Sequence, residues 1–103
     1  MKYNDILLLK DLLETNGIPF DFSPLFDGFQ ICYPVSDSRI CSVVEHKNSY
    51  GSSSDLLEMR GLLTLDEEES DDVVGYLTSL EVYDRIKNHW DENKNLIKEM
   101  YDL

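Results

Sequence analysis

The C-terminal part of the chain contains a helix capping box followed by a long stripe of apolar positions at helical spacing. Thr78 and Glu81 are three residues apart, so the threonine hydroxyl can accept from the amide of residue 81 while the glutamate reaches back. Apolar side chains then recur at spacings of three and four residues, which predicts one helix from about Ser79 to Met100. The stripe positions are Val82, Ile86, Trp90, Asn93 and Ile97. Such a helix has to bury its apolar face against another layer of secondary structure.

A shorter helix is predicted near the N-terminus, from about Asp5 to Thr15. Asn4 or Asp5 can cap its first turn, and the dipeptide Asn16-Gly17 provides a stop that Pro19 reinforces. The apolar positions, which follow helical spacing, are Ile6, Leu9, Leu12 and Leu13.

Between these helices the spacing of apolar residues becomes alternating, as in strands. A turn at SDSR joins the first two strands, a polar loop KNSYGSSS follows them, and Gly61 counts against a helix in DLLEMRGLLTL. The predicted strands span residues 29–35, 40–46, 56–65 and 73–77, whereas DFSPLFDG is interpreted as a turn. The expected fold is α+β, an antiparallel four-stranded β-meander flanked by an N-terminal and a long C-terminal helix. One face of the sheet would be covered and the other left partly wet.

The 103 residues are expected to form a single acidic domain, 1–103. A hydrophobic content of 42% argues against intrinsic disorder despite a net charge of −12. This charge disfavours direct binding to nucleic acid or to a membrane and favours a basic protein surface, although acidity can also serve solubility alone. No apolar stretch is long enough for a signal sequence or a membrane span, so we expect a cytoplasmic protein. The oligomeric state stays open.

The segment LDEEESDDVV concentrates six carboxylates within seven residues. We expect it to be the exposed tip of the hairpin between the third and fourth strands. It is then either a solvated loop or a decoy for a basic cleft, because extended residues advance about 3.3 Å each and the phosphates of one DNA strand about 3.4 Å. It lacks the ligand spacing and the glycine of an EF-hand, so no metal is expected. The candidate partner-binding residues are Asp66, Glu67, Glu68, Glu69, Asp71 and Asp72.

Three further side chains are candidates for partner binding. Leu56 and Leu62 fall on the polar face of the predicted third strand, where they would form a small exposed apolar patch. Tyr83 lies on the C-terminal helix, and aromatic residues are enriched at interfaces. Whether Tyr50 and His46 belong to a site stays open, since Tyr50 is explained more simply as an aromatic lid over the sheet.

Motifs for catalysis are not apparent, and we expect a protein that is not an enzyme and takes no cofactor. The chain has no G-x-S-x-G elbow, no Gly-rich phosphate loop and no paired Cys or His spacing typical of zinc. A small hydrolase-like enzyme using His46 is a remote alternative. Cys32 and Cys41 would face each other if their hairpin loop had two residues, whereas a longer loop would shift the register. We expect free thiols in the cytosol.

The segments FDGFQICYPV, CSVVEHKNSYG, LLEMRGLLT and VVGYLTSLEVYDRIKNHW resemble small proteins of bacteriophages and prophages. This resemblance implies the cytoplasm of a bacterial host. In size and charge the chain is similar to inhibitors of host defence, including anti-CRISPR proteins, some of which imitate nucleic acid. The expected function is a phage-encoded inhibitor, anti-CRISPR-like or a nucleic-acid mimic, that binds the basic surface of a host nucleic-acid-binding protein such as a nuclease. An immunity- or antitoxin-type protein that neutralises a basic toxin is the alternative.

Overall fold

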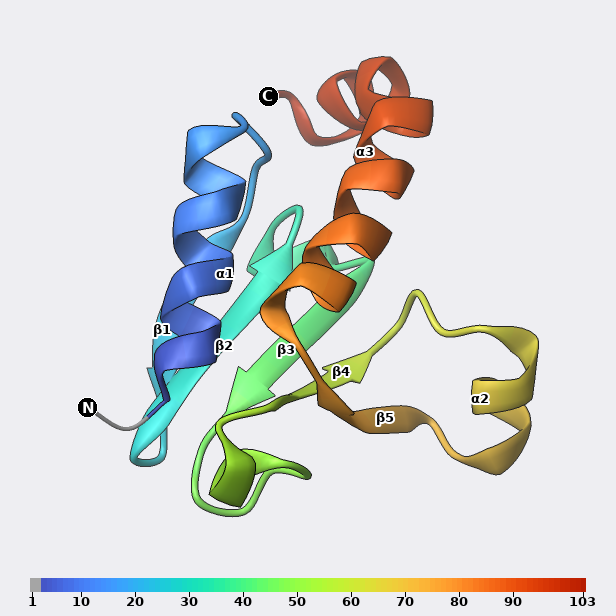
Figure 1. Ribbon diagram of the computed structural model, residues 1–103. Coiled ribbons are helices and arrows are strands. Elements are labelled where there is room, and N and C mark those ends of the chain that lie inside the picture. The colour runs from blue at the N-terminus through green and yellow to red at the C-terminus, as the bar shows by residue number, and fades with distance from the viewer. Residues whose placement is uncertain (1–2) are drawn as a thin grey trace.

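A computed structural model describes residues 3–103 as an antiparallel sheet with two long helices on one of its faces (Figure 1). The five strands lie in sequence order, so each pairs with the next. The strands are β1 (Asp21–Leu25), β2 (Gly28–Tyr33), β3 (Cys41–Glu45), β4 (Leu57–Arg60) and β5 (Val73–Leu77). The helices are α1 (Asn4–Thr15), α2 (Leu65–Ser70) and α3 (Ser79–Tyr101), and short 3-10 turns occur at η1 (Ser36–Ser38) and η2 (Ser52–Ser54).

The α+β architecture and both long helices are confirmed, but the sheet has five strands rather than four. The strand that sequence reasoning missed is β1, because Ser23 and Pro24 are typical of turns. Since β1 is an edge strand, Pro24 can occupy it without removing a needed donor from a central ladder. Phe22 stabilises this edge by stacking on Phe29 of β2, with ring centroids 5.0 Å apart.

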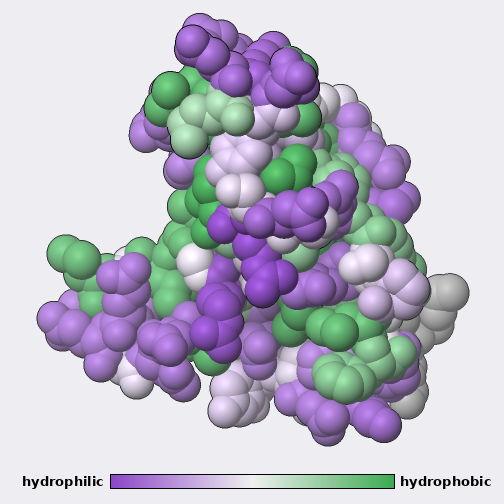
Figure 2. Space-filling view, turned by 180° about the vertical axis from the view of Figure 1, so that it is seen from behind, coloured by the Kyte–Doolittle hydropathy of each residue, from purple (hydrophilic) through white to green (hydrophobic). Residues whose placement is uncertain are grey.

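The core lies between the sheet and the two helices. The predicted stripe of α3 is buried at Val82, Ile86, Trp90 and Ile97, and α1 buries Ile6, Leu9 and Leu13. The sheet contributes alternate residues, among them Ile31, Tyr33, Val43, Leu57 and Met59. Within residues 3–103 no helix lies on the opposite face of the sheet, and this face is mostly hydrophilic along its centre (Figure 2). The expectation of one covered and one partly wet face therefore holds.

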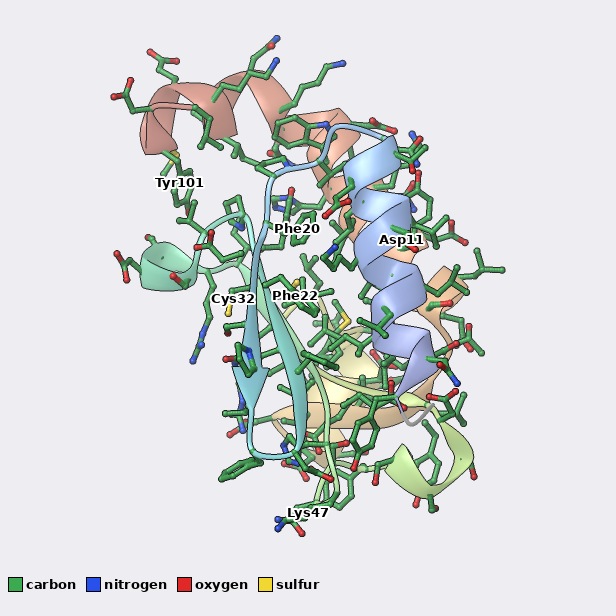
Figure 3. All side chains as sticks on the ribbon, turned by 90° about the vertical axis from the view of Figure 1, so that its left-hand side faces the viewer. Asp11, Phe20, Phe22, Cys32, Lys47 and Tyr101 are labelled. Carbon is green, nitrogen blue, oxygen red and sulfur yellow. The ribbon has the colours of Figure 1, made fainter. Side chains whose placement is uncertain are left out.

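The two cysteines lie on opposite faces of the sheet and are free thiols. Tyr33 pairs with Cys41, and Cys32 pairs with Ser42, because the connection between β2 and β3 contains η1 and is longer than two residues. Figure 3 shows Phe22 on the side of the sheet that faces α1 and Cys32 on the other side.

The third predicted strand is shorter than expected, and the acidic run is not the tip of a simple hairpin. Strand β4 ends at Arg60, and the chain then turns at Gly61, whose φ is 86°. A Cβ at Gly61 would lie 2.4 Å from the carbonyl oxygen of Ile40, so only glycine fits this turn. Residues 65–70 form the helix α2 instead of continuing the strand.

Candidate partner-binding site

The connection between β4 and β5, residues 61–72, forms a lobe that projects from the β5 side of the sheet (Figure 1). We call these residues the acidic lobe, because they include all six carboxylates of the run. Its helix α2 contacts β5, and the lobe is mainly hydrophilic in the view from behind (Figure 2).

A capping box starts α2. The Thr64 hydroxyl accepts a hydrogen bond from the Glu67 amide at 3.2 Å, and the Glu67 carboxylate accepts one from the Thr64 amide at 2.8 Å. This pair repeats the Thr78–Glu81 box of α3, which the sequence predicted. The Thr64–Glu67 box has the same sequence motif and could have been recognised in the same way. It was missed because a strand was expected to continue through Leu65.

Arg85 of α3 anchors the acidic lobe to the rest of the domain. Its Nη1 and Nη2 donate to the two carboxylate oxygens of Glu67, at 2.7 and 2.9 Å, and Nη1 also donates to the Leu62 carbonyl at 3.2 Å. Both side chains of the pair are largely shielded, with exposed fractions of 23% for Arg85 and 22% for Glu67. Hydrogen bonding from Arg85 lowers the pKa of Glu67 to about 2. Glu67 is therefore a structural anchor, whose carboxylate oxygens already accept hydrogen bonds from Arg85 and Thr64.

The other carboxylates of the lobe remain available to a partner. Asp66, Glu68 and Glu69 on α2 are exposed, as is Leu65, whose exposed fraction is 79%. Asp71 accepts a bond from the Asp72 amide, and Asp72 lies 3.9 Å from Arg60 in a pair that is open to solvent. An ion pair this exposed contributes little to the stability of the fold, so Asp72 can exchange it for a contact with a partner at low cost.

The helical state of α2 changes the comparison with DNA. Residues in a helix advance about 1.5 Å each, so the carboxylates of α2 do not match successive phosphates of one strand. Side chains three and four residues apart share one face of a helix, which brings Asp66 and Glu69 together. The lobe therefore presents a compact cluster of charge rather than an extended ladder.

The side chains expected to form an exposed apolar patch are partly covered. Leu62 and Tyr83 pack against the core, and Leu56 is half-buried. The chain reverses at Gly61, so Leu62 does not sit on the polar face of a strand, and the expected patch with Leu56 is not formed.

His46 and Tyr50 belong to the loop between β3 and β4, and their surroundings differ. The His46 ring is buried, with Nδ1 facing the Asn48 amide at 3.1 Å and Phe26 packed edge-on at a centroid distance of 5.0 Å. Tyr50 is not a lid, because 54% of its surface is exposed. A second exposed aromatic that sequence reasoning did not single out is Tyr76, at 65%.

A pocket of about 320 Å³ opens at the same end of the molecule, lined by Tyr3, Lys47, Ser52 and Ser53. Asp27 supports its wall by accepting hydrogen bonds from the Tyr3 hydroxyl at 2.6 Å and from the Lys47 amide at 2.9 Å. Lys47 marks this end of the molecule in Figure 3. The described lining offers hydroxyl groups and one ammonium, without a paired nucleophile and base.

Glu45 is a fully buried carboxyl that the sequence analysis did not identify. Its Oε1 accepts from the Ile6 amide at 3.1 Å, so it caps the first turn of α1. Burial, together with a hydrogen bond to Asp55, raises the pKa of Glu45 to about 8. The signal was present in CSVVEH, where Glu45 follows Cys41 and Val43 at alternate positions on the apolar face.

Comparisons of the chain with protein-family models, with curated proteins and with solved structures found no match. Within residues 3–103, none of the helices combines the length and apolar character needed to cross a bilayer. The same residues hold no cluster of three or more His, Cys, Asp or Glu side chains arranged for a metal ion.

Proposed function

We propose that this chain is a non-enzymatic acidic binding protein that uses its acidic lobe to occupy the basic surface of another protein. The observation that supports this proposal is the Arg85–Glu67 anchor, which holds α2 in place while its remaining carboxylates face solvent. A helix of six residues would not persist on its own in water, so the anchor and the capping box supply its order.

Pre-ordering of the lobe favours binding. A disordered acidic segment loses conformational entropy when a partner fixes it, whereas α2 is already ordered by contacts inside the domain. A net charge of −12 attracts a basic cleft over long distances and accelerates encounter at low salt.

The partner that we propose is a nucleic-acid-binding protein of a bacterial host, such as a nuclease, and the chain would act in the host cytoplasm as a phage-encoded inhibitor. Proteins that bind nucleic acid expose clusters of Lys and Arg, and these are the surfaces that a carboxylate cluster complements. The phage origin rests on the resemblance of the sequence segments, and the inhibitory role rests on the charge.

The test compares two variants that lose the same charge at different places. The lobe variant carries Asp66→Asn, Glu68→Gln, Glu69→Gln, Asp71→Asn and Asp72→Asn, and it keeps the Glu67 anchor. The control variant carries Asp11→Asn, Asp37→Asn, Glu92→Gln, Glu99→Gln and Asp102→Asn, all exposed positions outside the lobe. Wild type and both variants are used to capture proteins from a bacterial host lysate at low and high salt.

We expect a basic protein to be retained by wild type and by the control variant, and to be lost with the lobe variant and at high salt. Titration of the purified captured protein then gives its affinity for the chain. A host nuclease as the retained protein would support the inhibitor proposal, whereas a basic toxin would support the alternative of an immunity- or antitoxin-type protein. Equal retention by both variants would reduce the acidic run to a solubility device.

A further inference from the structure

Two carboxyl groups, those of Glu45 and Asp55, meet inside the domain. Glu45 ends β3 and is fully buried, whereas Asp55 belongs to the loop of residues 46–56 that leads to β4. A hydrogen bond joins the two side chains. An ionised carboxylate has no proton to donate, so this bond exists only while one of the two groups is protonated.

The shared proton resides on Glu45. Asp55 accepts hydrogen bonds from the Asp5 amide, at 3.2 Å, and from Asn4, and these donors favour its ionised form. Glu45 accepts from the Ile6 amide at 3.1 Å, but within residues 3–103 no group donates to its Oε2. A buried carboxylate with so few donors is costly, so Glu45 stays neutral and donates to Asp55.

The groups that face Glu45 do not compensate a negative charge on it. Asp55 faces it from the loop and Asp5 faces it from α1. The phenol of Tyr3 faces it from the residue before α1. The adjacent His46 accepts a hydrogen bond at Nδ1 from the backbone of the loop. Ionised Glu45 would therefore meet two carboxylates without a cation among these groups.

The hydrogen bonds around this pair join the loop 46–56 to the first turns of both long helices. Asp55 ties the loop to α1 through the Asp5 amide, and the Asp5 carboxylate accepts from the Ser79 amide of α3 at 2.8 Å. Helix α1 is also fixed by its buried apolar face, whereas the loop consists of turns and the short η2. The loop is therefore the part that moves when the contact is lost.

The pocket of about 320 Å³ lies across the same junction. Tyr3 lines it from the start of α1, and Lys47, Ser52 and Ser53 line it from the loop. Its walls thus come from the two segments that the Glu45–Asp55 bond helps to hold together. In Figure 3 the loop passes Lys47 and lies next to the first turn of α1.

We propose that Glu45 and Asp55 form a pH-sensitive latch, which holds the loop 46–56 against α1 while Glu45 is protonated and releases it when that proton passes to solvent. Release separates two like charges and lets water reach Glu45. It also widens the pocket, because Ser52 and Ser53 move away from Tyr3. The latch lies outside the acidic lobe and does not depend on the proposed function.

Hydrogen exchange of the whole chain, followed by NMR from about pH 5.5 to about pH 7.5, tests the latch. In the open state Glu45 has the ordinary pKa of about 4.3, so over this range opening releases one proton. The equilibrium constant for opening then rises about tenfold per pH unit. The protection factor of the Asp5 amide, which donates to Asp55, should fall about a hundredfold across the range and stay below those of β2 and β3.

A neutral paramagnetic chelate reports on the pocket. It should broaden the ring signals of Tyr3, which is buried while the latch is closed, more strongly at about pH 9 than at about pH 6.

Glu45→Gln is the locked variant. Its amide nitrogen can donate to Asp55 in place of the acid proton, while its oxygen accepts from the Ile6 amide, so neither measurement should change with pH. Asp55→Asn is a second test, because asparagine can donate to ionised Glu45, and it should weaken the pH dependence. The control is Glu58→Gln: Glu58 accepts from the Tyr50 amide of the same loop at 3.0 Å, and a glutamine oxygen can keep that bond. This control should behave as wild type.

Three results would overturn the latch. The first is protection of the Asp5 amide that does not depend on pH in wild type, and the second is a decline that persists in Glu45→Gln. The third is protection of Asp5 equal to that of β2 and β3, which would mean that Glu45 reaches water only when the whole domain unfolds.

Discussion

Glu45 lies beneath the first turn of α1, where its Oε1 accepts a hydrogen bond from the Ile6 amide at 3.1 Å. Two further carboxylates complete this junction: Asp55 accepts from the Asp5 amide at 3.2 Å, and Asp5 accepts from the Ser79 amide at 2.8 Å. The N-terminal ends of α1 and α3 are therefore held to each other and to the sheet by acidic groups. Among the described residues no donor faces Oε2 of Glu45, which favours its protonated form.

The stability of the domain should fall as pH rises toward 8, because of Glu45. Burial, and to a smaller extent the hydrogen bond with Asp55, raises the pKa of Glu45 to about 8 in the folded state. The pKa of an exposed glutamate is about 4.3. Between these values the folded state binds more protons than the unfolded state, so the free energy of unfolding decreases with increasing pH. Urea unfolding at pH 7 and pH 9 measures the effect.

The control for this prediction is Glu45→Gln. A neutral amide keeps the shape and should make the variant more stable than wild type at pH 9, by about 1–3 kcal/mol. The lowered pKa of Asp55 acts only at acidic pH, and the lowered pKa of His89 acts below its ordinary value of 6.5, so neither produces the decline above pH 7. An unchanged pH dependence in Glu45→Gln would contradict the assignment.

Removing the Arg85–Glu67 pair should release the acidic lobe. Arg85→Met removes the hydrogen bonds that Arg85 donates to the Glu67 carboxylate and the Leu62 carbonyl, and it should destabilise the domain by about 1–2 kcal/mol. Hydrogen exchange should accelerate over residues 65–70 and stay slow in β2 and β3. The Lys87–Asp91 pair is the control, since it is exposed, and Lys87→Met should cost less than about 0.5 kcal/mol.

Gly61→Ala should be far more destabilising than Gly17→Ala. Both glycines have a positive φ, of 86° and 66°, so alanine is strained at either position. At Gly17 the added methyl group meets open space, whereas at Gly61 it lies 2.4 Å from a backbone oxygen. We expect a loss of about 1 kcal/mol at Gly17 and of about 3 kcal/mol or more at Gly61, measured by chemical denaturation. Similar losses would show that the turn at Gly61 can relax.

Local signals in the sequence determined both long helices. The Thr78–Glu81 box and the stripe that follows are contained within a few turns, so they predict α3 without knowledge of the rest of the fold. Alternation likewise predicted the strands β2, β3 and β4, although β4 ends at Arg60 rather than at residue 65. It failed for β1, where Pro24 is tolerated only because the strand lies at an edge.

Contacts between distant residues decided the candidate site. The acidic run is visible in the sequence, but its helical state depends on Arg85, which approaches Glu67 only after α3 has packed on the sheet. The backbone contact of Tyr50 with Tyr76 joins a loop to β5, with Gly75 packed against Tyr50 and Gly51 against Tyr76, and no spacing rule links these positions. Composition determined the charge of this protein, whereas tertiary packing decided which carboxylates and which rings remain exposed, because burial is a property of the folded chain.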